Sequence, residues 1–320
     1  MKYPNKLINK NIGITAMSDG QAAKIEKFNK SLKNLKDRGF NLKITPDVYW
    51  SGSGFGKGKI KAQELNELIN DKSIEMIICA SGGDFLYEII PYVDYESIKK
   101  DPKWYMGNSD PTTLLYIITT MLDIATIYGF NASSFDEIFK HQEEALKIMN
   151  GNIEKQLSYE KYEAENWSNI YTETVYWKTP RGEVNVEGRI IGGCIDSLKL
   201  LINSEFDYTK EFINRYYKDG IIWYFDNFSL TTEDFYLTLL SMKRSGWFKN
   251  TKAVILGRVC FPGGFSDITY EEAIKEVFPQ EKIIINADIG HVSPRMTIIN
   301  GSYAKLKSKD GKGSLELLLK

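Results

Sequence analysis

The sequence predicts an α/β protein in two parts: an N-terminal doubly wound parallel sheet of the Rossmann or flavodoxin type, and a β-rich, barrel-like C-terminal domain. Through the first 150 residues, short apolar runs alternate with amphipathic segments of helical period, which is typical of strand–helix–strand units. From about residue 170 onward, β-forming segments separated by turn residues predominate. The length of 320 residues suits two domains better than one. We expect them at residues 1–150 and 171–320, joined by a polar linker over residues 151–170.

In the first domain, apolar periodicity defines the elements. Apolar residues from Ile25 to Leu35 recur at helical spacing, and Gly39 lies where such a helix would end. Residues 74–80 form a nearly unbroken apolar run, as expected of a parallel strand that is covered on both faces. Residues 103–107 indicate the next strand, and residues 112–128 a long, mostly apolar helix.

In the second domain, strands outnumber helices. The expected helices are residues 232–245 and 270–277, and Asn300-Gly301 is a strong hairpin signal after the last run. The expected strands are residues 172–178, 184–191, 220–225, 253–257, 283–287 and 296–299.

Composition excludes several functional classes. Hydrophobic residues make up 42% and charged residues 26%, and the formal net charge is −1, so no overall field would gather nucleic acid or an anionic membrane. No apolar run approaches the roughly 18 residues of a membrane span, and the N-terminus lacks the pattern of a secretory signal. The three cysteines, Cys79, Cys194 and Cys260, are too few and too widely spaced for a disulfide framework or a zinc motif. We therefore expect a cytoplasmic protein with no nucleic-acid or membrane partner.

The apolar run at residues 74–80 leads into Ser81-Gly82-Gly83-Asp84. Active groups of a doubly wound sheet lie at the carboxyl ends of its strands. Paired glycines there let the backbone approach a ligand and can present free N–H groups to an anion. The alternative interpretation is a tight turn from strand to helix.

The following strand ends in Gly107-Asn108-Ser109-Asp110-Pro111 and runs directly into a helix. This segment resembles a nucleophile elbow, although the second glycine of G-x-S-x-G is absent. Ser109 would be the nucleophile, and the N–H of Asp110 would face the oxyanion. The alternative is that Ser109 caps the helix, with Pro111 in its first turn.

Of the two histidines, only one is placed as a general base. His141 lies on a charged helical segment, where we expect a solvated side chain. His291 lies in a loop bounded by Gly290 and Pro294 after a buried strand, which is a suitable place to line a cleft. A structural histidine bonded within its own loop is the alternative.

The orienting acid is expected at Asp226, after a run of five large apolar residues at a strand end. A carboxylate there is costly to bury without a partner. Asp226 could instead lie near the N-terminus of the next helix, but Thr231 is the better capping residue. Asp196 and Glu187 are the rival acids.

Taken in order, several segments from about Ile12 to Gly301 resemble the LD-carboxypeptidase family of serine peptidases, which includes the microcin-immunity peptidases. The resemblance depends on six markers in the expected order and at roughly the expected spacing. They are Ser81 to Asp84, Pro91 to Asp94, Gly107 to Asp110, Glu187 to Cys194, Gly257-Arg258 and Gly290-His291.

The resemblance implies a two-domain homodimer that hydrolyses amide bonds. No metal ion or cofactor is expected, because the chain offers neither clustered His and Cys nor a G-x-G-x-x-G. It implies a catalytic triad of Ser109, Asp226 and His291, with Gly83 and Asp110 as backbone oxyanion donors. The serine would come from the first domain, and the acid and the base from the second.

Three positions depart from the usual family pattern. Asp226 stands where Glu is usual, Ser81 where many LD-carboxypeptidases carry Arg, and Cys194 where Asn is common. A shorter acid reaches about 1.5 Å less far, and the loss of an arginine removes an anchor for a substrate carboxylate.

The turn at Gly82, Gly83 and Asp84 resembles the microcin-immunity branch, and we expect these residues to contact substrate. Members of that branch cleave an amide between a peptide or amino acid and a nucleotide mimic, and they stack the base on a loop tryptophan. Trp177 is a possible counterpart of this tryptophan, with packing in the core as the alternative.

These features leave two main functional hypotheses. The first is a serine carboxypeptidase-like hydrolase that acts on LD-peptide bonds of muropeptides or on peptidyl- or aminoacyl-nucleotide amides. The second is a family member with a weakened triad that only binds a peptide or nucleotide conjugate. A nucleotide-dependent enzyme on the Rossmann-like sheet is a third, weaker hypothesis, because the chain has no G-x-G-x-x-G.

Overall fold

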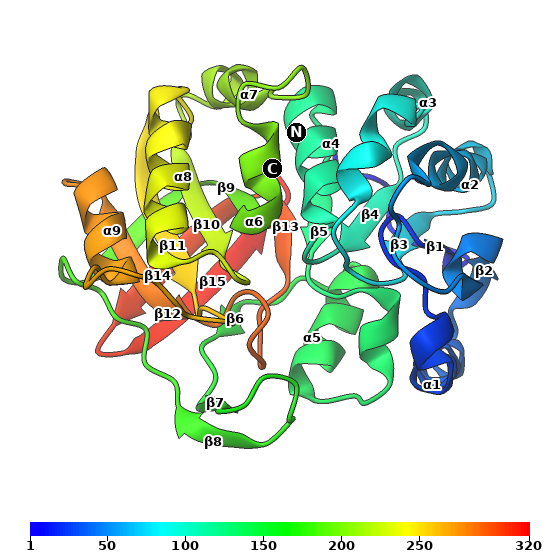
Figure 1. The fold of residues 1–320 in the computed structure, drawn as a ribbon, viewed down its shortest axis with the longest axis horizontal. Coiled ribbons are helices and arrows are strands. Elements are labelled where there is room, and N and C mark those ends of the chain that lie inside the picture. The colour runs from blue at the N-terminus through cyan, green and yellow to red at the C-terminus, as the bar shows by residue number, and fades with distance from the viewer. The chain divides into compact units, whose positions relative to one another are not determined.

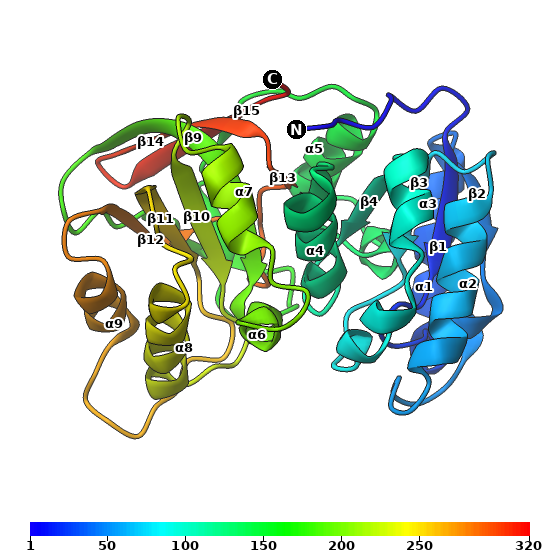
Figure 2. The ribbon, with the colours of Figure 1, turned by 90° about the horizontal axis from the view of Figure 1, so that it is seen from above.

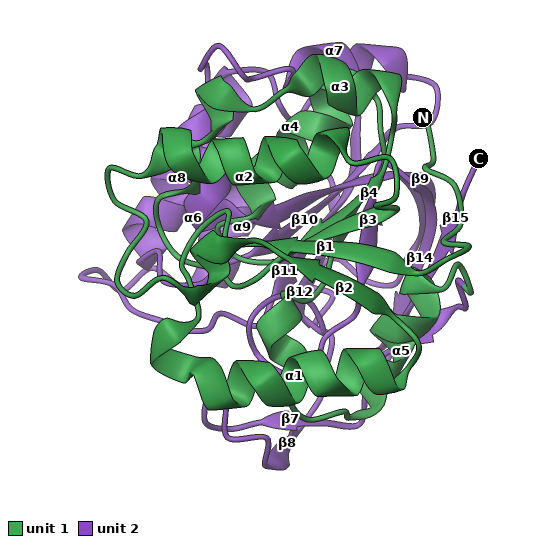
Figure 3. Ribbon diagram, turned by 90° about the vertical axis from the view of Figure 1, so that its right-hand side faces the viewer, with its two compact units in different colours: residues 1–152 green, residues 153–320 purple.

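A computed structural model describes residues 1–320 of the chain. The chain folds as two compact units, residues 1–152 and residues 153–320, which Figure 3 draws in green and purple. The segment expected to be a linker contains two short strands, β6 (Gln156–Leu157) and β7 (Lys161–Glu163). No helix is both long enough and apolar enough to cross a lipid bilayer.

Unit 1 is built on parallel strands in the order β5-β4-β3-β1-β2, the flavodoxin-like order expected of a doubly wound sheet. All residues of β3 and β4 are buried, as the apolar runs predicted. The strands are β1 (Asn11–Thr15), β2 (Asn41–Ile44), β3 (Met76–Cys79), β4 (Trp104–Gly107) and β5 (Thr126–Tyr128).

Helices cover both faces of this sheet. Figure 3 shows α2, α3 and α4 on one face, and α1 and α5 on the other. The helices are α1 (Ile25–Asp37), α2 (Gly58–Asn70), α3 (Tyr95–Lys100), α4 (Thr112–Leu122) and α5 (Lys140–Met149).

Two expectations for unit 1 were wrong. The apolar segment 112–128 is not one helix, because α4 ends at Asp123 in a left-handed conformation and the chain then enters β5. Continuous apolarity cannot separate a buried helix from a buried strand. His141 is not solvated either: it is 2% exposed, with ring contacts to Phe130 and Phe139.

Unit 2 contains a mixed seven-stranded sheet in the order β12-β11-β10-β9-β14-β15-β6. The first four strands of this order are parallel, whereas β14, β15 and β6 pair antiparallel. The strands are β9 (Val184–Cys194), β10 (Ile221–Asp226), β11 (Thr251–Gly257), β12 (Lys282–Ala287), β14 (Tyr303–Lys309) and β15 (Lys312–Leu318). A separate pair is formed by β7 and β8 (Tyr171–Thr174).

The helices of unit 2 are α6 (Ile195–Leu198), α7 (Thr209–Arg215), α8 (Thr232–Arg244) and α9 (Tyr270–Val277). The last two lie side by side on one face of the sheet (Figures 1 and 2). Their packing and a cluster of stacked aromatic rings around Trp223 and Trp247 form the core there.

The expected hairpin at Asn300-Gly301 was also wrong. A turn does follow β13 (Ile298–Asn300), with Gly301 at a φ of 81°. However, β14 pairs with β9 and β15 and not with β13. Turn residues fix the local bend, but the burial of side chains in the sheet decides which strands pair.

Candidate active site

Ser109 follows β4 in a strained turn. Its φ is 68°, a left-handed value that is rare for a non-glycine residue and persists only where the surroundings hold it. The side chain of Asn131 fixes the preceding residue, because its amide bonds both the N–H and the carbonyl of Asn108 at 3.1 and 3.2 Å. Pro111 is the N-cap residue of α4, and no side chain makes a capping hydrogen bond at this end of the helix. Ser109 therefore does not cap α4.

The space beside Ser109 is provided by Gly82, which follows β3. A Cβ at Gly82 would lie 3.0 Å from the Cβ and 3.1 Å from the Oγ of Ser109. The backbone at Gly82 can approach the serine hydroxyl closely only because it carries no side chain.

Two backbone donors near this turn have no protein acceptor. The N–H groups of Gly83 and Asp110 donate no hydrogen bond, whereas Thr112 N–H donates to the Ser109 carbonyl at 2.9 Å. Backbone N–H groups without an acceptor are available to bind an anionic oxygen atom. Asp84 is exposed at the same edge.

The carboxylate of Asp110 holds the loops around the serine turn together. It is 4% exposed and accepts hydrogen bonds from Ser18 Oγ at 2.5 Å and from Leu86 N–H at 2.8 Å. Ser18 in turn lies against Gly83. Asp110 thus ties the loops after β1 and β3 to the serine turn. Burial raises the pKa of its carboxyl to about 6, although the two hydrogen bonds oppose that rise.

This raised pKa predicts a pH-dependent stability difference between the wild type and Asp110→Asn. Between an unfolded pKa near 3.8 and a folded pKa of about 6, the folded wild type binds more protons, so this group makes it less stable as pH rises through that window. The amide does not titrate. We expect the variant to gain about 2–3 kcal/mol relative to wild type between pH 4 and pH 7. Urea unfolding at each pH measures this change, and a constant difference would contradict it.

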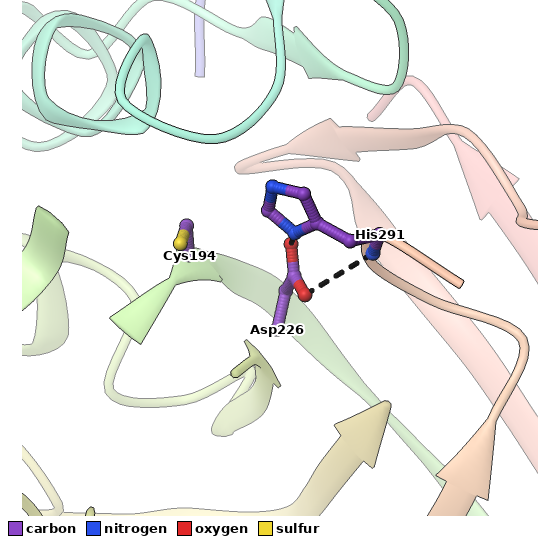
Figure 4. Close-up of side chains that lie close together, drawn as sticks. All are labelled: Cys194, Asp226 and His291. Atoms are coloured by element: carbon purple, nitrogen blue, oxygen red, sulfur yellow. Dashed lines mark hydrogen bonds and ion pairs between the residues drawn. The ribbon is translucent and has the colours of Figure 1, made fainter. Parts of the chain in front are cut away.

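In unit 2, Asp226 and His291 form a buried pair (Figure 4). Asp226 is the last residue of β10, is 0% exposed and places Oδ2 2.7 Å from Nδ1 of His291. The Nδ1–Oδ2 distance is within ion-pair range, but the geometry of this contact does not meet the criteria for a hydrogen bond. Oδ1 also accepts the backbone N–H of His291 at 3.2 Å. One carboxylate therefore fixes both the ring and the backbone of the histidine, and it leaves Nε2 for other chemistry.

The short acid reaches its partner because the histidine backbone comes to it. Gly290 has a φ of 108°, and a Cβ at this position would overlap Oδ1 of Asp226. Only glycine permits this approach. The methylene that Asp lacks relative to Glu is therefore compensated in the backbone.

The alternatives to Asp226 have other roles in the fold. Thr231 caps α8 by accepting Asp234 N–H at 3.2 Å, so Asp226 is not a capping residue. Asp196 accepts the backbone N–H groups of Phe228 and Ser229, each at 3.0 Å. Glu187 accepts the hydroxyl of Tyr303 at 3.3 Å.

A second buried ion pair holds the loop that carries His291. Arg258 lies 2.6 Å from Asp288 and donates to the carbonyl oxygens of Pro294 at 2.7 Å and Val292 at 3.3 Å. Burial raises the pKa of Asp288, and the nearby guanidinium opposes the rise. Glu163 on β7 accepts the N–H of Ser293 at 2.8 Å. The loop is thus fixed before and after the histidine.

The structure corrects the interpretation of Trp177 as a base-stacking residue. Its ring is 1% exposed, and its Nε1 donates to Asp288 at 2.9 Å. A ring enclosed in this way has no free face for a nucleobase, and its role is to pack the core and support the buried ion pair.

Sequence reasoning missed a row of aromatic rings that leads outward from His291. The distance between ring centroids is 4.6 Å from His291 to Phe228, 5.2 Å from Phe228 to Phe261 and 5.6 Å from Phe261 to Trp167. Exposure rises along the row, to 44% at Phe261 and 58% at Trp167. These rings come from three separate loops, so no spacing in the sequence groups them. The one available signal was a tryptophan within a polar segment.

A cavity of about 520 Å³ opens beside this row. Its walls include Tyr162, Asn166, Cys260 and Val292, which flank the aromatic row and the histidine loop. Cys194, Asp226 and His291 form a cluster of potential metal-ligating side chains, in which one ligand atom from each lies within 4.8 Å of the others.

The fold and these features define a two-domain α/β protein with a serine turn in one unit and an acid–histidine pair in the other. The sequence matches the LD-carboxypeptidase N-terminal domain over residues 12–129 and the LD-carboxypeptidase C-terminal domain over residues 187–306. The chain belongs to the LD-carboxypeptidase family, a family of peptidases.

Individual relatives agree with this placement. The microcin C7 self-immunity protein MccF of Escherichia coli is 29% identical over 303 residues, covering 85% of this chain and 83% of its own. A putative carboxypeptidase of Vibrio cholerae is 28% identical over 252 residues, covering 72% and 71%. The solved structure of MccF in complex with aspartyl sulfamoyl adenosine has the same fold, with a TM-score of 0.82 at 23% identity over 99% of this chain and 98% of that one.

Proposed function

We propose that the protein is a serine hydrolase that cleaves the amide between an amino acid or peptide and a nucleotide-like group. Ser109 attacks the carbonyl carbon, and Nε2 of His291 takes the serine proton and later gives it to the leaving amine. Asp226 holds the ring and stabilises the imidazolium, while the N–H groups of Gly83 and Asp110 stabilise the oxyanion. Water then hydrolyses the acyl-enzyme. The mechanism requires the two units to meet so that Nε2 reaches the Ser109 hydroxyl.

The observation that carries this proposal is the backbone of Ser109. A non-glycine residue at a φ of 68°, with glycine against its hydroxyl and no role as a helix cap, has no structural explanation in the fold. Strain of this kind is typical of a residue held for chemistry. The 2.7 Å approach of Asp226 to Nδ1 of His291 supports Asp226 as the orienting acid.

Two observations favour the nucleotide conjugate over a muropeptide. Ser81 stands where an arginine could bind a free substrate carboxylate, and its hydroxyl instead donates to the Asp19 carbonyl at 2.8 Å. The row from Phe228 to Trp167 ends in two exposed rings, Phe261 and Trp167, on which a nucleobase could stack. MccF, whose solved complex contains aspartyl sulfamoyl adenosine, is among the relatives.

The test compares two substrate sets and one covalent probe. We expect the wild type to hydrolyse aminoacyl sulfamoyl adenosines faster than muropeptides ending in D-Ala. A fluorophosphonate should modify Ser109, and mass spectrometry of the digested protein would locate the adduct. Faster muropeptide cleavage would overturn the substrate class. Tight substrate binding with neither turnover nor an adduct would favour the binding-protein alternative.

The aromatic row yields a separate prediction for Trp167→Ala. Loss of one stacking ring costs about 1–3 kcal/mol of base binding, so the KM for an aminoacyl-nucleotide substrate should rise about tenfold while kcat changes little. A substrate of the same acyl group without the base should be unaffected. Tyr217→Ala, which removes an exposed ring outside the row, is the control. Equal losses for both substrates would show that Trp167 does not bind the base.

The sequence predicts a cytoplasmic protein and the family resemblance implies a homodimer, and we retain both as part of the proposal. All three cysteines are free and buried, as suits a reducing compartment. Sedimentation equilibrium would measure the oligomeric state, and cell fractionation the location.

A further inference from the structure

Cys194 ends β9 directly beside Asp226, which ends β10. The two residues are register partners in adjacent parallel strands, so their side chains leave the same face of the sheet as neighbours. The His291 ring joins them through its contact with Asp226, and Figure 4 shows the three side chains together. One potential ligand atom from each residue lies within 4.8 Å of the others, and all three residues are buried.

This trio has the donor set of a soft divalent cation. Thiolate, imidazole and carboxylate are the ligands that Zn²⁺ takes in proteins, at about 2.3, 2.0 and 2.1 Å. In a tetrahedron with these bond lengths, ligand atoms are separated by about 3.3–3.7 Å. The Asp226–His291 contact of 2.7 Å and the 4.8 Å limit of the cluster bracket this separation, so a change of at most about 1.5 Å in any one separation would close the site around an ion.

A zinc ion bound by one thiolate and one carboxylate carries no net charge, so the loaded cluster adds no charge to the interior. The Cys194 thiol donates to Asp196 Oδ2 at 3.6 Å, and it must lose its proton to solvent as the metal binds.

We propose that Cys194, Asp226 and His291 form an inhibitory zinc site within the acid–base pair. Ligation of Nδ1 keeps the remaining ring proton on Nε2, so the ring cannot accept a proton from Ser109. Coordination also removes Asp226 from its role as the orienting acid. This inhibition rests on the proposed hydrolase function, but the site itself does not. The sequence predicts no metal site because the three ligands lie far apart along the chain.

The first experiment tests the site without substrate. Cobalt(II) is added to metal-free wild type, to Cys194→Asn and to the control Cys260→Ser, which alters a buried cysteine outside the cluster. We expect a thiolate-to-cobalt charge-transfer band in wild type and in the control, at one ion per chain, and its displacement by zinc. The band should be absent from Cys194→Asn, with Cys194→Ser as a second variant should the first not fold. A band that persists in these variants, or that never forms in wild type, overturns the proposal.

The second experiment measures inhibition, with the metal-free rate of each protein as its own reference. One equivalent of zinc should lower the wild-type rate about tenfold or more, and a chelator should restore it, while Cys194→Asn should lose less than about twofold. Inhibition of both proteins alike would show that zinc acts elsewhere and would overturn the inhibitory role. If the metal-free wild type has no hydrolase activity, the proposed function is wrong. The cobalt band would still show whether the metal site exists.

Discussion

Ser109→Ala is expected to lower kcat by about four to six orders of magnitude while leaving the fold and KM nearly unchanged. The hydroxyl is the nucleophile of the proposed mechanism, and removal of a serine nucleophile costs rates of this order. The oxyanion donors at Gly83 and Asp110 are backbone groups and stay in place, so some activity above the uncatalysed rate should persist. Steady-state kinetics on an aminoacyl sulfamoyl adenosine measures the effect.

The alanine variant should also show little change in stability, and this feature separates a nucleophile from a structural residue. Alanine at a φ of 68° carries the same backbone strain as serine, and Gly82 still leaves room for its Cβ. Ser81→Ala is the matched control, because Ser81 is a hydroxyl residue just after the neighbouring strand β3. Turnover by Ser109→Ala within about tenfold of wild type would refute the nucleophile assignment.

Asp226→Asn is expected to lower kcat by about four orders of magnitude, the second largest effect. The amide can still accept the backbone N–H of His291, so the loop should remain in place. It cannot stabilise an imidazolium, and its NH₂ group can force the wrong ring tautomer. Kinetics of this variant should therefore show a large loss in kcat with a small change in the free energy of unfolding.

Asp226→Glu, which restores the usual family residue, is the informative companion. Gly290 leaves no space beside Oδ1, so an added methylene must displace the histidine loop. Overpacking of this kind costs about 1–3 kcal/mol. We expect Glu to be more destabilising than Asn in urea unfolding but to retain more activity. If Asp226→Glu is as stable as wild type, the close approach of Gly290 to Asp226 does not explain why the shorter acid fits here.

Much of the fold was predictable because burial leaves a direct trace in the sequence. The apolar run at residues 74–80 forms β3, and Thr231, the predicted capping residue, caps α8. The merged segment 112–128 shows the limit: both α4 and β5 are buried, so apolarity alone could not separate them. The burial of His141 was likewise not predicted, because Phe130, which packs on its ring, comes from a separate segment of the chain.

The sequence by itself determined the two-part α/β architecture, the family and the candidate residues Ser109, Asp226 and His291, because local periodicity and short motifs encode them. Only the tertiary structure decided that Gly82 lies against the serine, that Gly290 brings the histidine to a short acid, and that Cys194 lies beside both acid and base. These are contacts between residues on different strands and loops. Sheet register and backbone approach set such contacts, and neither is written in the spacing of residues along one segment.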